Sequence, residues 1–186
     1  MKVYYHQNNG VIVELRSETP PAAPYIERDR ALPIPVQAGH IPKLAADFGN
    51  DEVWYELIET LEGAKQRKIA EIVAYDKSSA VDEFLINGVG MWLDRDTRAS
   101  LFASITAEEA IGRETTVLWT QTEPPFPIEL PIIPFRGLLK QLEVYAKDCF
   151  NTTAKHIAAV FALTSIEDVN DYDFTTGYPE KLSIGL

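Results

Sequence analysis

The amino-acid sequence predicts an α+β protein in two parts, and two observations support this fold class. Two short segments near the N-terminus carry β-branched and aromatic residues on either side of an Asn-Gly pair. Two further strand pairs follow in the C-terminal half, and each pair leads into a helical pattern. We therefore expect an N-terminal hairpin, a proline-rich strap and a connecting helix over residues 1–76, then a ββα-ββα domain over residues 77–186 that ends in a long helix.

The N-terminal part is expected to begin with a β-hairpin. Residues 3–6 and 11–15 favour strands, and the intervening Asn9-Gly10 tolerates the positive φ angles of a tight turn. Residues 17–42 contain six prolines, which fix φ and remove backbone donors. This stretch is therefore expected to be an extended, loop-like strap.

A helix is predicted over residues 51–75, because apolar side chains recur there at three- and four-residue steps. Gly63 is a candidate break that would divide this helix into two. The second half is expected to be a connecting helix that ends near Asp76, so the domain boundary is placed at about residue 77. The predicted apolar stripe consists of Trp54, Leu57, Ile58, Leu61, Ala64, Ile69, Ile72 and Val73.

The C-terminal domain is predicted to begin with a hairpin over residues 84–93 that turns at Asn87-Gly88. The helix that follows runs to Gly112, and Asp94 stands at its expected N-cap. Thr106 and Glu109 also fit a capping box, which leaves open whether this segment is one helix or two short ones.

A second hairpin is predicted over residues 115–130, and prolines lengthen its turn. The helix after it ends near Leu163, one capped turn begins at Ser165, and the remaining tail is expected to be irregular. The long helix carries apolar residues at alternating four- and three-residue steps, which fits either a core helix or a self-association seam. The candidate seam residues are Leu139, Leu142, Ala146, Thr153, His156 and Val160.

Composition narrows the classes of partner. The formal net charge of −11 should repel nucleic-acid phosphates and anionic lipids, and the basic residues are scattered. No apolar run has the length of a signal peptide or a membrane span, so we expect a soluble protein without membrane insertion. Cys149 is the one cysteine, which excludes an intramolecular disulfide and fits a reducing compartment.

Catalytic and metal-binding motifs are absent from the sequence. His6, His40 and His156 lie far apart, and no glycine-rich phosphate loop or serine nucleophile motif occurs. We therefore expect no catalytic residue, no cofactor and no metal. The remote alternative is a carboxylate-based hydrolase that uses Asp94 and Asp96 with Arg98, whereas helix capping with a surface ion pair explains the same residues.

The C-terminal part carries a diffuse pattern of structural residues. It consists of Asn87-Gly88, Trp92-Leu93-Asp94, Thr97-Arg98, Leu118-Trp119, residues 142–146, Cys149, Thr153, His156, Ala159-Val160, Tyr172-Asp173 and Gly177-Tyr178-Pro179. Over about residues 69–182 this pattern resembles a domain-of-unknown-function family found in phage and prophage tail or tail-fibre gene clusters. Residues 1–68 loosely resemble the start of short tail-fibre assembly proteins. The resemblance implies a structural or assembly role and no catalytic residues.

The favoured hypothesis is thus a non-enzymatic tail-associated protein, a tail-fibre component or an assembly factor, that acts through protein–protein contacts. Its expected partner is a tail or fibre protein or a second copy of itself. It would reside in the bacterial cytoplasm during assembly or in the virion tail. The alternative is a receptor- or glycan-binding module of a tail tip. The expected interaction residues are Trp92, Asp94, Arg98, Trp119 and Tyr178.

Overall fold

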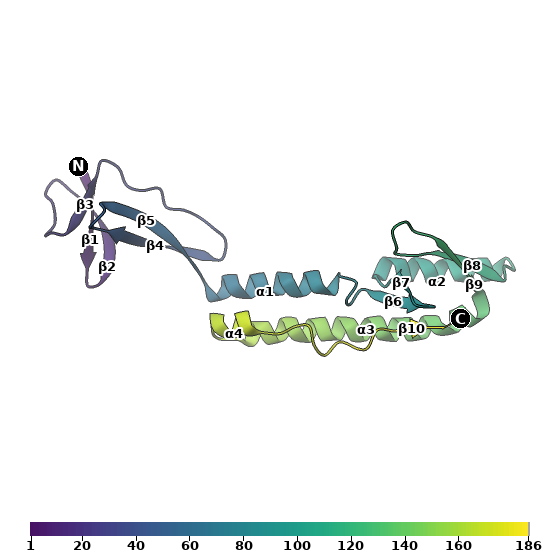
Figure 1. The fold of residues 1–186 in the computed structure, drawn as a ribbon. Helices are drawn as coiled ribbons and strands as arrows, with labels where there is room; N and C mark the ends of the chain where they lie inside the picture. Colours follow the sequence, from purple (N-terminus) through teal and green to yellow (C-terminus); the bar gives the residue numbers. More distant parts are fainter. Residues whose placement is uncertain (186) are drawn as a thin grey trace. The chain divides into compact units, whose positions relative to one another are not determined.

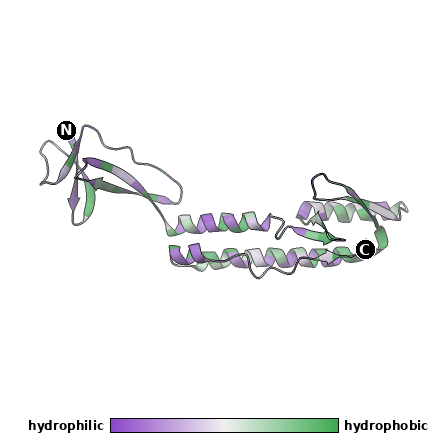
Figure 2. Ribbon diagram, viewed as in Figure 1, coloured by the Kyte–Doolittle hydropathy of each residue, from purple (hydrophilic) through white to green (hydrophobic). Residues whose placement is uncertain are grey.

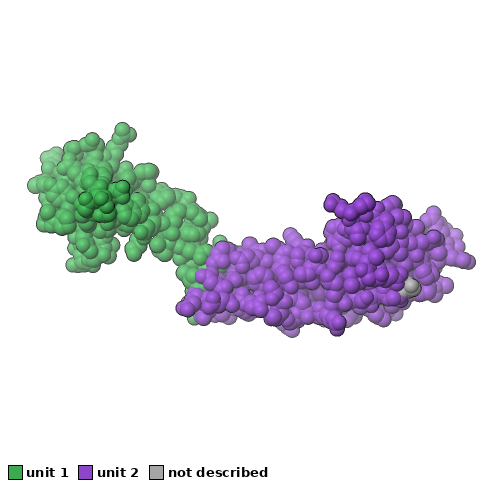
Figure 3. All heavy atoms as spheres, in the orientation of Figure 1, with its two compact units in different colours: residues 1–66, 164–166 green, residues 67–163, 167–186 purple. Residues whose placement is uncertain are grey.

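The computed structural model describes residues 1–185, which form a mixed α+β fold of ten strands in small sheets and four helices (Figure 1). The predicted fold class is confirmed. The chain divides into two compact units, shown in different colours in Figure 3. Unit 1 consists of Met1–Gln66 and Thr164–Ile166, and unit 2 consists of Arg67–Leu163 and Glu167–Leu186. The division between Gln66 and Arg67 falls within the first helix, α1 (Leu61–Asp76).

Unit 1 opens with the predicted hairpin of β1 (Lys2–Asn8) and β2 (Val11–Ser17), with positive φ angles at the Asn9-Gly10 turn. Strand β3 (Tyr25–Arg28) pairs with the other edge of β1, which gives the sheet order β2-β1-β3. The expectation that residues 17–42 are loop throughout is therefore wrong at β3 and at residues 40–42, where the next strand begins. Ile26 in this strand is 1% exposed, and burial of its side chain anchors the strand against the core.

The expectation of a helix throughout residues 51–75 is wrong in its first half. Residues Glu52–Glu59 form β5, which pairs antiparallel with β4 (His40–Asp47). Valine, tryptophan, tyrosine and isoleucine in this stretch fit a pleated strand, and full pairing with β4 satisfies its backbone groups on that side. The second half is helix α1, which ends at Asp76 as predicted.

Unit 2 contains the predicted hairpin of β6 (Glu83–Ile86) and β7 (Val89–Trp92), with positive φ angles at Asn87 and Gly88. Helix α2 (Arg95–Ala110) follows, and the Asp94 side chain accepts a hydrogen bond from the Thr97 amide at its N-terminus. The helix is continuous, so the alternative of two short helices is wrong, and Thr106 does not cap a second one. The Thr106 hydroxyl instead donates to the Phe102 carbonyl at 2.8 Å.

The second hairpin, β8 (Thr115–Trp119) and β9 (Pro127–Pro131), leads directly into α3 (Ile132–Ala162), as predicted. A short helix, α4 (Ile166–Asp171), supplies the expected single turn. The tail beyond it is not irregular throughout, since β10 (Ser183–Ile184) adds a parallel strand to β6. Ile184 is 4% exposed, so apolar burial fixes this strand.

One buried stripe of α3 holds unit 2 together, and Figure 2 shows its apolar residues alternating with polar ones along the helix. Leu142 is 1% exposed and packs in a cluster with the inner residues of β6, β7, α2 and β9. Among residues 1–185, no helix is both long enough and apolar enough to cross a membrane.

Candidate functional site

Two tryptophans that the sequence analysis singled out line one cavity at the junction of the two hairpins of unit 2. Trp92 ends β7 and is 49% exposed, whereas its neighbour Met91 points inward and is 4% exposed. Trp119 ends β8 and is 60% exposed. The Gln121 amide donates to the Gly90 carbonyl at 3.1 Å, and this bond ties the end of the second hairpin to the first.

A cavity of about 240 Å³, here called the tryptophan slot, lies at this junction. All of its lining side chains are aliphatic or aromatic except that of Thr97. The hydroxyl of Thr97 donates to the Asp94 carboxylate at 2.5 Å, so that donor is already in use. The lining residues are Phe84, Met91, Trp92, Thr97, Leu101, Leu118 and Trp119.

The outer face of the second hairpin extends the exposed apolar surface beyond the tryptophan slot. Thr116 and Leu130 form a cross-strand pair that is buried, so the alternate residues of the hairpin point outward. On this outer face Val117 is 51% exposed, and Trp119 stands opposite Pro127. The loop at the end of the hairpin is held by a hydrogen bond from the Phe126 amide to the buried Thr120 hydroxyl at 3.0 Å. This bond closes the loop directly after Trp119.

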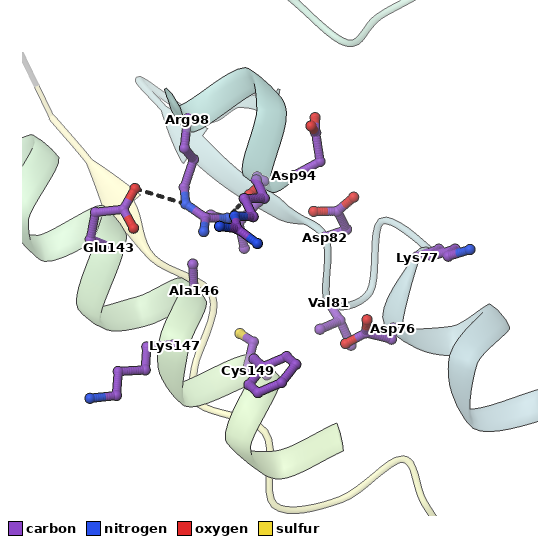
Figure 4. Close-up of a pocket in the computed structure, with 13 residues that line it drawn as sticks. Asp76, Lys77, Val81, Asp82, Asp94, Arg98, Glu143, Ala146, Lys147 and Cys149 are labelled. Atoms are coloured by element: carbon purple, nitrogen blue, oxygen red, sulfur yellow. Dashed lines mark hydrogen bonds and ion pairs between the residues drawn. The ribbon is translucent and has the colours of Figure 1, made fainter. Parts of the chain in front are cut away.

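Asp94 and Arg98 line a different cavity, of about 420 Å³, which Figure 4 shows between α1, α2 and α3. The Arg98 guanidinium donates to the Leu93 carbonyl and, at 2.9 Å, to Glu143. Arg98 thereby ties the start of α2 to α3. Asp96 is not among the residues that line this cavity.

Asp82 is a member of this cavity that the sequence analysis missed. Burial raises the pKa of its carboxyl group, and the nearby charges of Asp94 and Asp76 raise it further. For Asp94, burial acts in the same direction, but hydrogen bonds from Thr97 and the Asp96 amide outweigh it and lower the pKa. The signal in the sequence was an aspartate directly after Val81 at the entry to a buried strand.

The contacts of Asp94 and Arg98 in this geometry support a structural role and not a catalytic one. Asp94 caps α2, and the Asp94–Asp96 pair of the hydrolase alternative does not face one cavity. Cys149 lines the same cavity, and burial raises the pKa of its thiol and disfavours the reactive thiolate. Within residues 1–185, no group of three His, Cys, Asp or Glu side chains is placed to hold a metal ion.

Tyr178 lines neither cavity and belongs to a cluster that fastens the C-terminal tail to α3. Its hydroxyl is 2.9 Å from that of Thr153, which donates to Asp76 at 2.6 Å. His156 bonds Tyr172 through Nδ1 and the Thr176 carbonyl through Nε2. Lys68, whose side chain is 8% exposed, donates to the Asn170 carbonyl at 3.0 Å.

The candidate seam residues lie on the inner side of α3. All but His156 are buried within this single chain, and His156 is half-buried in the tyrosine cluster. This burial is that of a core helix, since the chain's own residues already occupy the stripe. The buried members are Leu139, Leu142, Ala146, Thr153 and Val160.

The structure therefore brings Trp92 together with Trp119 and Asp94 together with Arg98, and it places Tyr178 elsewhere. Comparisons with protein-family models, curated proteins and solved structures found no match for this chain.

Proposed function

We propose that this chain is a non-enzymatic phage or prophage tail-associated protein that binds a tail or fibre protein through the tryptophan slot. The phage context rests on the resemblance of about residues 69–182 described above. The binding mode rests on one observation: two exposed tryptophans line one largely apolar slot. The same contact through the tryptophan slot would serve a protein that remains in the virion and one that assists assembly in the bacterial cytoplasm.

The chemistry of the slot favours an apolar side chain of a protein partner. Tryptophan is enriched among the residues that dominate protein–protein binding energy, and such residues cluster in desolvated pockets. Contiguous exposed apolar surface on a soluble protein marks an interaction site. Val117 and Pro127 beside the slot widen this surface.

A glycan-binding module of a tail tip is the second candidate, because exposed paired tryptophans also stack on sugar rings. A sugar site needs several convergent polar groups to orient the hydroxyls. Apart from the indole N–H groups of its two tryptophans, the side chains of the slot offer only the hydroxyl of Thr97, which already bonds Asp94. We therefore rank protein binding above glycan binding.

The test is co-expression of the full chain with the tail-fibre protein of its own gene cluster, followed by affinity measurement. We expect a complex whose dissociation constant rises at least about tenfold for Trp92→Ala combined with Trp119→Ala, as for a hot-spot residue. Trp54→Ala is the matched control, since Trp54 is 41% exposed in the other unit.

The absence of a complex, or an equal loss of affinity in the Trp54→Ala control, would contradict the proposed function. Tryptophan fluorescence during titration with bacterial surface glycans separates the two candidates. A saturable change that disappears in the double variant would favour the glycan-binding module instead.

A further inference from the structure

The C-terminal half of α3 carries an exposed apolar strip beside the face that holds its tyrosine cluster. Phe150 is 68% exposed and Phe161 is 55% exposed. Between them Ala154 is exposed and Ile157 is half-buried. These four residues, here called the α3 strip, follow steps of four, three and four, which places them on one helix face.

The spacing of the α3 strip is symmetric about its centre. Phe150 and Phe161 stand at equal distances from the midpoint between residues 155 and 156, and so do Ala154 and Ile157. A second copy related by a two-fold axis at this midpoint would run antiparallel. Each Phe150 would then meet the partner's Phe161, and each Ala154 the partner's Ile157. A small side chain opposite a larger one lets the two helices approach closely.

The strip also lies where charge is sparse. The chain has a formal net charge of −11, so two copies repel each other overall, and this repulsion is weakest where neither copy carries acidic residues. Residues 149–163 contain no aspartate or glutamate, and Lys155 is their one lysine or arginine. Interface cores are depleted of charge and enriched in aromatic residues.

There is also open space beside the strip. Phe150 is among the residues that line the 420 Å³ cavity at Asp82 and Asp94. A partner ring that packs against Phe150 would lie beside this space and need not displace a core side chain.

We infer that the α3 strip is a self-association site at which two copies of this chain pack their α3 helices antiparallel. The strip spans twelve residues, about 18 Å of helix, which lies at the small end of specific interfaces. The dimer is accordingly weak and forms between about 10 µM and 1 mM. This surface shares no residue with the tryptophan slot, so the two proposals fail independently.

The test is sedimentation equilibrium of the full chain across that concentration range, with circular dichroism to verify folding of each variant. We expect the mean mass to rise towards twice the monomer mass. Phe150→Glu combined with Phe161→Glu should raise the dissociation constant at least about tenfold, because it sets like charges against each other across the two-fold axis.

A charge exchange then tests the antiparallel register. Phe150→Glu combined with Phe161→Lys places opposite charges across the proposed axis and should restore association. In a parallel pair the same variant would set like charges together and would not restore it. Val144→Glu is the matched control, since Val144 is 60% exposed on the same helix and lies about 120° away around it.

Three results would overturn the inference: a monomer at about 1 mM, dimers that the two-glutamate variant leaves intact, or an equal loss of association in Val144→Glu. Failure of the charge exchange to restore association would overturn the antiparallel arrangement.

Discussion

Asp94 and Asp82 line the same cavity, but their surroundings shift their pKa values in opposite directions. Hydrogen bonds from Thr97 and the Asp96 amide outweigh the burial of Asp94 and lower its pKa. Burial raises the pKa of Asp82, and the charges of Asp94 and Asp76 add to the shift. The folded state is therefore stabilised by the charge on Asp94 and destabilised by the charge on Asp82.

Removal of the Asp94 cap should lower the free energy of unfolding. Asp94→Ala should destabilise the chain by about 1 kcal/mol, whereas Asp94→Ser should retain most of the cap. Because the folded-state pKa is lowered, this stabilisation is present above the usual carboxyl pKa and is lost as the pH falls through the folded pKa. Urea titrations at about pH 7 and about pH 3 measure both effects. Equal stability of all three proteins at neutral pH would contradict the capping role.

Asp82→Asn should have the opposite effect. The raised pKa means that the destabilising charge is absent below the usual carboxyl pKa and develops as the pH rises through the folded pKa. We expect the variant to be more stable by up to about 1 kcal/mol at about pH 7, with no gain at about pH 3. Asp96→Asn serves as the control, because Asp96 is exposed in the first turn of α2. A gain in stability that does not depend on pH would show that the charge on Asp82 is not its cause.

At the scale of elements, Gly63 and Gly137 are both helical glycines with opposite surroundings. A Cβ at Gly63 would lie 2.1 Å from the Gly39 carbonyl oxygen, whereas a Cβ at Gly137 would meet nothing within 4 Å. Gly63 does not break α1. It lies in the first turn, where its amide donates to the Thr60 hydroxyl at 3.0 Å.

The two alanine variants should therefore change thermal stability in opposite directions. Gly137→Ala should stabilise by about 0.5–1 kcal/mol through helix propensity. Gly63→Ala should destabilise, because backbone atoms of Gly39 must move to admit the methyl group. Calorimetry of both variants is the measurement. Stabilisation by Gly63→Ala would show that residues 39 and 63 do not approach so closely.

The buried stripe of α3 allows a direct test of its role as a core element. Leu142→Ala should lower the free energy of unfolding by about 2–5 kcal/mol, because Leu142 is 1% exposed in the main cluster of unit 2. Val144→Ala, at a 60% exposed site two residues away, should change it by less than about 0.5 kcal/mol. Urea unfolding at a protein concentration low enough to favour the monomer distinguishes packing within the core from packing between two copies. Similar small effects at both sites would argue against the core assignment.

The secondary-structure elements also show which parts of the fold can be predicted from the sequence and which cannot. Local sequence signals were read correctly. The structure has the two hairpins with Asn-Gly turns, the Asp94 N-cap and the long helix α3, with its repeating apolar residues, where they were predicted. Residues 52–59 were misassigned because spacings of three and four fit a short segment that β4 instead pairs as a strand. That pairing is a tertiary effect, as is the addition of β10 to β6.

The candidate site, too, can be predicted from the sequence only where the signal is local. Trp92 and Trp119 were identified from residue type, but their shared slot depends on the junction of two hairpins. Asp82 and Lys68 were missed because their partners lie far away in sequence: Lys68 donates to the Asn170 carbonyl, which is 102 residues on. No periodic pattern encodes such contacts.

At the scale of the whole molecule, the second half of α1 belongs to unit 2, although the sequence placed the domain boundary after that helix, at about residue 77. Ile72 is fully buried, Asp76 accepts a hydrogen bond from Thr153, and Lys68 is held by the Asn170 carbonyl. A fragment that starts at residue 77 lacks all three of these side chains, whereas a fragment that starts at residue 67 keeps them.

We therefore expect residues 67–186 to unfold cooperatively, and residues 77–186 to melt at a markedly lower temperature or without a cooperative transition. Loss of the buried Ile72 alone should remove about 2–5 kcal/mol, a large share of the stability of a domain of this size. Lys68→Met and Asp76→Asn in the longer fragment separate the polar contacts from the apolar ones. If the two fragments melt at the same temperature, the residues of α1 after Gln66 do not stabilise unit 2, and the structural boundary belongs after the helix.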